Sequence, residues 1–281
     1  MTAILNTASR SGSARRTRSL LRLLAINVTV TLHYRGNFFL MQLANLVTPL
    51  VSLLVWHAAL ASGAQLPVSS DYLTSYFVLV AVARMLTSSW TAAFLAESIR
   101  LGELARWLVR PASTHWEHVA NNVGEKLVKL ALVLPVLAGL AVVLHQRMRL
   151  PTSTTTWMLF GVSLLMAAVL VFALDVLVGA SAFWFDEVSG FDRARRLIVG
   201  VLSGVVVPLA LMPGWAAGVV AVQPFRFTVS FPLEVLLGSG GVADQSLAAG
   251  FCWQAGWTAA FVAAAAAVWR LGLRSYSAAG A

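Results

Sequence analysis

The sequence predicts an all-α integral membrane protein with six transmembrane helices, an N-terminal amphipathic interfacial helix, and short re-entrant outer helices between spans five and six. Of the 281 residues, 59% are hydrophobic and only 11% are charged, whereas soluble domains average about 25% charged residues. Six apolar runs are long enough to cross a bilayer, and the basic residues gather on one side of them. These observations exclude a soluble globular domain, a disordered chain and a small disulfide-linked secreted module.

Each predicted span is a run of roughly 20 mostly apolar residues, the length that crosses about 30 Å of hydrocarbon. We expect a single transmembrane domain over residues 1–281, with spans at about 38–60, 73–95, 127–144, 157–185, 197–222 and 247–269. The fifth span contains Pro208 and Pro213, which argue against one unbroken helix there.

The N-terminal arm, residues 1–37, is predicted to be cytosolic. Residues 19–37 place several apolar side chains on one helical side, and arginines precede them, as in helices that lie on the inner leaflet. A targeting signal is the alternative, but no small-residue cleavage site follows a clean apolar core. We therefore favour an interfacial helix.

The basic residues predict the orientation, because short cytoplasmic loops hold an excess of Lys and Arg. With both termini cytoplasmic, sixteen of the twenty basic residues lie inside, three lie in outer loops (Arg147, Arg149, Arg226), and Arg84 lies within the membrane. The net charge of +9 is thus a topology signal. It requires no nucleic-acid partner.

Motifs for catalysis and metal binding are missing from the sequence. Cys252 is the single cysteine, and the five histidines are scattered, so no zinc-ligand spacing occurs. There is no phosphate-binding G-x-x-x-x-G-K-[ST] loop, no G-x-S-x-G and no H-E-x-x-H. We expect neither intrinsic enzymatic activity nor a cofactor in this chain.

The loop between spans two and three, residues 96–122, carries the most specific pattern. Its first half reads as an amphipathic helix that Pro111 stops, and Ser113 or Thr114 can cap a second helix with Glu117 as capping partner. Two short helices joined by a proline corner would project from the inner face. An ordinary interfacial hairpin lying on lipid is the alternative.

Two ionisable residues fall inside predicted spans. Arg84 lies mid-span and must face protein or water, because a charge at the bilayer centre costs at least about 2.5–3.5 kcal/mol. Asp175 is the carboxylate that the same depth suggests as its partner. The two are either polar contacts in a translocation path or at a dimer seam, or a structural ion pair, and the sequence leaves open whether they pair. The mixed charges of residues 186–196 are interpreted as a solvated loop.

The outer segment, residues 213–246, is too short to span twice and too apolar to be wholly solvated. It predicts short helices that dip back into the outer leaflet, and its prolines and glycines would set the turns.

Three motifs together resemble one family. GELARWLVRPAS in the loop between spans two and three, PFRFTVSFPLEVLLG in the outer segment and WRLGLRSYSAAGA at the C-terminus are similar, in order and spacing, to motifs of the six-span permease subunits of type-2 class ABC exporters. The resemblance covers essentially the whole chain. Ala112-Ser113 departs from the family pattern, in which a bulkier residue follows the proline.

The resemblance implies an ATP-driven exporter in the cell (inner) membrane. This chain would form the translocation path with a second permease, identical or related, while two separate ATPase subunits bind ATP and Mg²⁺. The loop over residues 97–116 would be the coupling element, with an ATPase docking surface of Glu103, Arg106, Arg110, Pro111, His115 and Trp116. The outer segment would form a gate with Phe225, Phe231 and Pro232. The cargo, a small molecule, lipid or peptide, is not specified, and a stand-alone secondary transporter or channel is the alternative.

Overall fold

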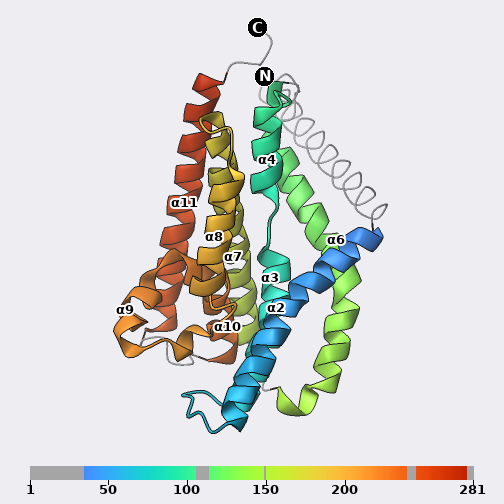
Figure 1. The fold of residues 1–281 in the computed structure, drawn as a ribbon. Coiled ribbons are helices and arrows are strands. Elements are labelled where there is room, and N and C mark those ends of the chain that lie inside the picture. The colour runs from blue at the N-terminus through green and yellow to red at the C-terminus, as the bar shows by residue number, and fades with distance from the viewer. Residues whose placement is uncertain (1–34, 106–113, 149, 239–244, 277–281) are drawn as a thin grey trace, which may run out of the picture.

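The computed structural model describes residues 35–105, 114–148, 150–238 and 245–276, and every regular element in these ranges is a helix (Figure 1). Three described helical stretches are long and apolar enough to cross a membrane: Ser70–Arg100, Thr154–Phe183 and Leu247–Ser275. The all-α membrane class is thereby confirmed, while the count of six spans stays a prediction. The expected interfacial helix at 19–37 lies almost wholly outside the described residues.

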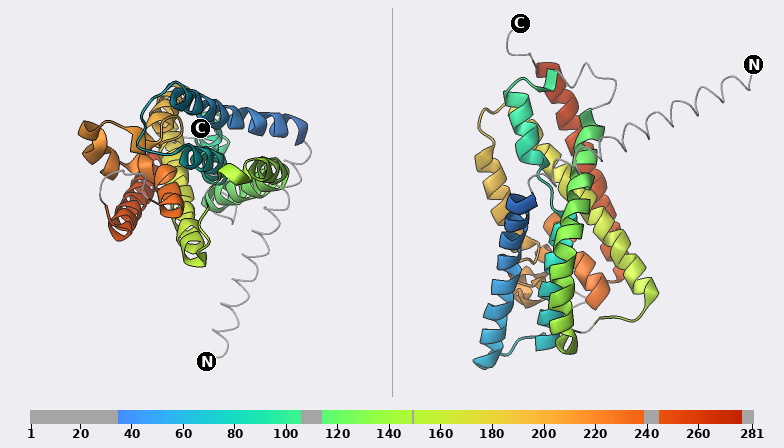
Figure 2. Two further views of the ribbon diagram at one scale, coloured as in Figure 1. Left: turned by 90° about the horizontal axis from the view of Figure 1, so that it is seen from below. Right: turned by 90° about the vertical axis from the view of Figure 1, so that its right-hand side faces the viewer.

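Helices α2 (Arg35–Ala61) and α3 (Ser70–Thr87) form an antiparallel hairpin at one side of the molecule (Figures 1 and 2). The turn between them includes Gly63 at φ +91°, a conformation that favours glycine. Ser69 then caps α3, because its hydroxyl accepts a hydrogen bond from the Tyr72 amide at 3.2 Å. α3 is the central helix of the core, with Leu73, Tyr76, Phe77, Val80 and Ala83 buried.

The second predicted span is broken in its middle. After α3, residues 88–90 leave the helix, and α4 (Thr91–Arg100) continues in nearly the same direction (Figure 1). The Ser89 hydroxyl accepts from the Thr91 amide at 3.3 Å and donates to the Thr91 hydroxyl at 2.9 Å. Such local side-chain bonds compete with the helical ladder, so they account for the break.

Helix α6 (Thr114–Val143) runs without interruption from the loop into the third predicted span. Its start at Thr114 agrees with the predicted cap, but the expected second short helix and the third span are one element. A short turn, η1 (His145–Arg147), precedes α7 (Thr154–Ala180). α7 packs against α3, α4, α10 and α11 and is the second central helix.

The expected fifth span, 197–222, is not one helix. η2 (Ser181–Phe183) is followed by α8 (Ser189–Leu202), η3 (Leu209–Leu211) and α9 (Gly214–Val222), with Gly204 at φ +88° after α8. Donors from other elements bond the carbonyls at the end of α8 and just after it. The side-chain amide of Gln223 donates to the Leu202 carbonyl (2.7 Å), and the Tyr76 hydroxyl donates to the Gly204 carbonyl (2.9 Å). Pro208 and Pro213, which lack an amide proton, start the segments that follow.

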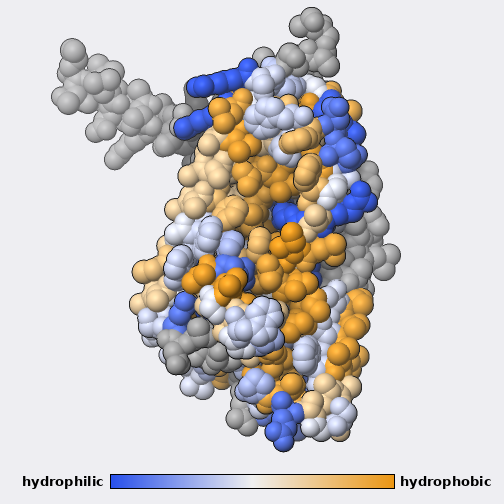
Figure 3. Space-filling view, turned by 60° about the vertical axis from the view of Figure 1, so that its left-hand side comes forward, coloured by the Kyte–Doolittle hydropathy of each residue, from blue (hydrophilic) through white to orange (hydrophobic). Residues whose placement is uncertain are grey.

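The remaining elements are η4 (Pro224–Thr228), α10 (Ser230–Leu237) and α11 (Leu247–Ser275). α10 is buried along almost its whole length, between α3 and α7, and α11 packs along α7. We call the end of the molecule with Arg100 and Arg270 the α4 end, and the opposite end, with α9 and α10, the α10 end (Figures 1 and 2). Between the two ends, one face is broadly apolar (Figure 3).

Candidate functional site

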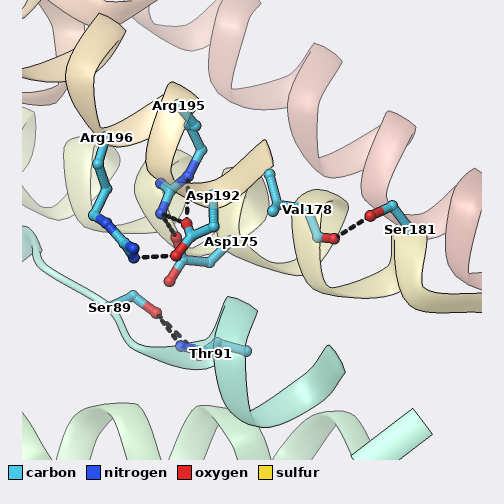
Figure 4. Close-up of polar contacts among 8 residues, drawn as sticks. All are labelled: Ser89, Thr91, Asp175, Val178, Ser181, Asp192, Arg195 and Arg196. Carbon is cyan, nitrogen blue, oxygen red and sulfur yellow. Dashed lines mark hydrogen bonds and ion pairs between the residues drawn. The ribbon is translucent and has the colours of Figure 1, made fainter. Parts of the chain in front are cut away.

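A charged cluster joins α7 to α8 in the interior. Asp175 of α7 is 0% exposed, and its Oδ1 lies 2.9 Å from Nη2 of Arg195 on α8 (Figure 4). The same Nη2 is 2.7 Å from Oδ1 of Asp192, and Arg196 forms an ion pair with the other oxygen of Asp192. We call Asp175, Asp192, Arg195 and Arg196 the charged cluster.

The local sequence of α8 explains the cluster. Asp192, Arg195 and Arg196 are spaced by three and four residues, which places them on one helix side. At the start of α8 the Glu187 carboxylate accepts a hydrogen bond from the Ser189 amide at 2.8 Å. Hydrogen bonds from Ser189 hold the pKa of the exposed Glu187 carboxyl below its usual value. α8 therefore begins with a fixed negative charge near its positive end.

The charged cluster and Arg84 line a cavity of about 330 Å³ at the break between α3 and α4. α2 contributes Leu46 to its wall, α3 contributes Ala81 and Met85, and residues 88–93 supply the joint and the first turn of α4. A second cavity of about 170 Å³ shares Arg84 and the charged residues Asp175, Arg195 and Arg196, and extends towards Ser203 and Thr228. The break in α3–α4 thus opens space around charges that the sequence places inside spans.

The sequence left open whether Arg84 and Asp175 pair, and in the structure Asp175 pairs with Arg195. Neither oxygen of Asp175 accepts a well-aligned hydrogen bond, although the Ser89 hydroxyl and the Ala92 amide lie close enough to interact with it. Arg84 has no ion-pair partner among the side chains that the structure describes. The position of Arg84 and Asp175 along their spans identified both residues. It did not specify the rotation of α8, which decides which residue pairs with Asp175.

Sequence reasoning missed Asp192, Arg195 and Arg196 as site residues, because a mixed charge run is usually a solvated loop. The signal that could have found them is the D-x-x-R-R spacing followed by the apolar residues 197–202, which is typical of a helix entering the membrane with its charges on one side. Arg195 is mostly buried, whereas Arg196 remains largely exposed.

The predicted coupling loop is described only at its two ends. α4 ends at Arg100 and Gly102 has φ +71°, so the helix that was expected to run to the stop at Pro111 is interrupted there. Leu104 is 0% exposed and packs in a cluster with Leu95, Ile99, Ala180 and Trp269. Glu103 is half-buried beside it. Arg106, Arg110 and Pro111 lie outside the described residues, and His115 and Trp116 are described only as backbone of α6.

The predicted gate residues lie at the α10 end. Phe231 and Pro232 are buried in α10, and Phe225 is half-buried in η4. The ring of Phe231 stacks edge-on with Phe227 (5.4 Å) and Phe251 (5.3 Å). The structure therefore brings two of the three residues into the core rather than onto an open surface.

A buried ion pair, which the sequence did not reveal, holds these aromatic residues together. Arg226 and Glu234 are each 3% exposed, and Nη2 of Arg226 lies 2.5 Å from Oε2 of Glu234. Nη1 of Arg226 donates to the Ala221 carbonyl (2.6 Å) and to Gln245 Oε1 (2.9 Å), and Ser230 donates to Glu234 (2.8 Å). The guanidinium carbon lies 5.6 Å and 5.5 Å from the Phe227 and Phe231 ring centres. Arg226 lies in η4 and Glu234 in α10, and their spacing of eight residues across two short helices follows no simple periodic pattern that the sequence could reveal.

Comparison with known proteins gives one match. Residues 69–280 match the family model described as "ABC-2 family transporter protein". No curated protein and no solved structure matches the chain. The matched range contains the α3–α4 break, the predicted coupling loop, the charged cluster and the α10 end.

Proposed function

The chain belongs to the ABC-2 family of transporter proteins, and from this premise we propose that it is the transmembrane subunit of an ATP-driven exporter. It forms the translocation path with a second permease, identical or related. Two separate ATPase subunits bind and hydrolyse ATP with Mg²⁺, and this chain contributes no catalytic residue. The cargo that leaves by this efflux path is a small molecule, a lipid or a peptide.

One observation carries the coupling part of this proposal. The loop that joins α4 to α6 leaves a span whose last turns are packed against the ends of α7 and α11, and Leu104 is buried at that junction. A partner that pulls on residues 97–116 therefore acts directly on α4 and, through it, on α7 and α11. Arg106, Arg110 and Trp116 supply the charge and the aromatic area that docking surfaces use.

The proposed orientation places the α4 end in the cytoplasm of a cell whose inner membrane holds the protein. The basic residues Arg100, Arg193, Arg270 and Arg274 support this orientation. Six crossings follow if α2, α3–α4, α6, α7, α8 with the segment after it, and α11 each cross once. α9, η4 and α10 are then the re-entrant outer helices, and both termini are cytoplasmic.

The apolar surface supports membrane insertion and a permease partner. Large hydrophobic side chains are exposed along α2 (Val47, Leu54, Val55) and α7 (Met158, Leu165). In a bilayer such side chains contact lipid tails or another spanning helix.

The coupling proposal predicts the effect of charge reversal in the loop. When the chain is co-expressed with an ATPase subunit encoded by a neighbouring gene, we expect the two to co-purify. Arg106→Glu together with Arg110→Glu should separate them or abolish the stimulation of ATP hydrolysis by the permease, a loss of about 5- to 150-fold for typical coupling energies. The measurement is ATPase activity and subunit stoichiometry in the same detergent.

The matched control is Arg270→Glu together with Arg274→Glu, which reverses two exposed arginines of the same end on α11. It should leave ATPase association and stimulation unchanged. If no ATPase associates with the wild-type chain and the purified chain alone still transports, the exporter proposal fails and a stand-alone transporter replaces it.

A further inference from the structure

We propose that the cavity at the α3–α4 break binds the anionic head of an amphiphilic molecule, a phosphodiester or a carboxylate that carries an apolar tail. Three features of the cavity support this: the balance of charge inside it, the donors in its lining and its apolar side chains. That the chain binds such a molecule is independent of the exporter role. The identification of this molecule as cargo rests on the proposed function.

The charges that line the cavity do not cancel. Arg195 bridges the two carboxylates of Asp175 and Asp192, and Arg196 pairs with Asp192. Arg84 is the third guanidinium that lines the same cavity, and it has no ion-pair partner among the described side chains. Three arginines against two aspartates leave one net positive charge. An uncompensated charge at this depth is costly, so a bound monoanion would relieve the cost.

The backbone adds donors on the same side. The first turn of α4 lines the cavity with Ala92 and Ala93, and that turn contains no acidic residue. Trp90, which precedes α4, makes no side-chain cap, and the amides of Ala92 and Ala93, which have no acceptor within the helix, belong to residues that line the cavity at the positive end of the helix. The Ala92 amide lies close to the buried Asp175 carboxylate on this side of the cavity.

Part of the lining of the cavity is apolar, which selects an amphiphile over a free inorganic ion. Leu46, Ala81, Met85 and Trp90 line it, and α2 next to Leu46 exposes Val47 and Leu50 outwards. A volume of about 330 Å³ is at the lower end of small-molecule sites. It holds a head group and the first carbons of a tail, while the remainder of the tail lies along α2.

The fixed aspartates set the charge selectivity. A cation in this cavity would meet three guanidinium groups, and the carboxylates that could attract it are already paired. A polyanion would be repelled by Asp175 and Asp192 once the single positive charge is neutralised. The site therefore prefers one negative charge.

The test measures binding of radiolabelled dodecanoate, a monoanion at neutral pH, to the full-length chain in phosphatidylcholine nanodiscs, with empty nanodiscs subtracted. We expect saturable binding that weakens about tenfold or more in Arg84→Gln, because a charge-assisted hydrogen bond is lost. Arg84→Lys retains the charge and should bind within a few-fold of wild type. Arg270→Gln, an exposed arginine outside the cavity, should have no effect. Equal thermal unfolding temperatures of the variants show that they are folded.

Two further arms separate the sources of the ligand. Dodecyltrimethylammonium, with a tail of similar length and opposite charge, should not compete, and neither should inorganic phosphate at equal concentration. Displacement by phosphatidylglycerol in the nanodisc assigns the site to a membrane lipid, and resistance to it assigns the site to cargo. Binding that is unchanged in Arg84→Gln, or equal competition by the ammonium or by inorganic phosphate, overturns the proposal. Because no ATPase is present, such a failure leaves the exporter proposal untouched.

Discussion

Glu234→Leu should lower the free energy of unfolding by about 3–5 kcal/mol, the range observed when one partner of a buried ion pair is removed. The variant leaves the Arg226 guanidinium, 3% exposed, without its carboxylate. Ser230 also loses its acceptor. Equilibrium unfolding of the purified chain in detergent measures the difference.

The double variant Arg226→Met with Glu234→Leu is the informative control. Both side chains become apolar at similar volume, and such replacements of a whole buried pair are often neutral. We expect it to recover a large part of the stability lost in Glu234→Leu, with a coupling energy of several kcal/mol in the double-mutant cycle. If the two single losses simply add, Arg226 and Glu234 do not act as a pair, and the packing of the α10 end depends on its aromatic rings alone.

The spans that could be predicted are those in which hydrophobic length is a local property. The regions of α7 and α11 are nearly free of charge over their whole length, so their helices follow from composition and length. The α3–α4 break could not be predicted in the same way, because serine is tolerated within spans. The break depends on the two hydrogen bonds between Ser89 and Thr91.

The depth of the site along the spans could be predicted from the sequence, but the pairing of its charged residues could not. Arg84 and Asp175 could be identified from the sequence because a charge within the hydrocarbon region is costly and therefore rare. Which charge meets which depends on the rotation and tilt of α8, which brings Arg195 to Asp175 from a segment interpreted as a solvated loop. Arg226 and Glu234 show the same limit at the α10 end, because η4 and α10 turn around a non-helical joint that no periodic pattern encodes.

The Arg226–Glu234 pair and the charged cluster differ in how completely their groups are enclosed and hydrogen-bonded. The Arg226–Glu234 pair is closed: its groups are hydrogen-bonded to each other and to neighbouring carbonyl, amide and hydroxyl groups, so it stabilises one arrangement of the α10 end. The charged cluster is open: it lines cavities and includes Arg196, which is largely exposed. If the chain is the permease of an exporter as proposed, we expect the α10 end to keep its arrangement while the region of the charged cluster rearranges.

Leu104→Ala should uncouple the loop from the spans while leaving ATPase docking intact. Leu104 is 0% exposed against Leu95, Ile99, Ala180 and Trp269, so truncation leaves a cavity that costs about 2–5 kcal/mol. In the co-purified complex we expect normal subunit stoichiometry but loss of the permease-dependent stimulation of ATP hydrolysis. This outcome differs from that of the Arg106 and Arg110 reversals, which act on the docking surface itself.

Leu101→Ala is the matched control, because it removes the same atoms from the same turn at a position that is 58% exposed. It should change the free energy of unfolding by no more than about 0.5 kcal/mol and leave stimulation intact. The reason for the contrast lies in the junction itself: Phe183 packs edge-on against Trp269 and lies against Gly272, where an added Cβ would clash. We therefore expect the loop, η2 and α11 to move as one body only while Leu104 fills their common core. If Leu104→Ala stimulates ATP hydrolysis as wild type does, force from the loop reaches the spans through α6 instead.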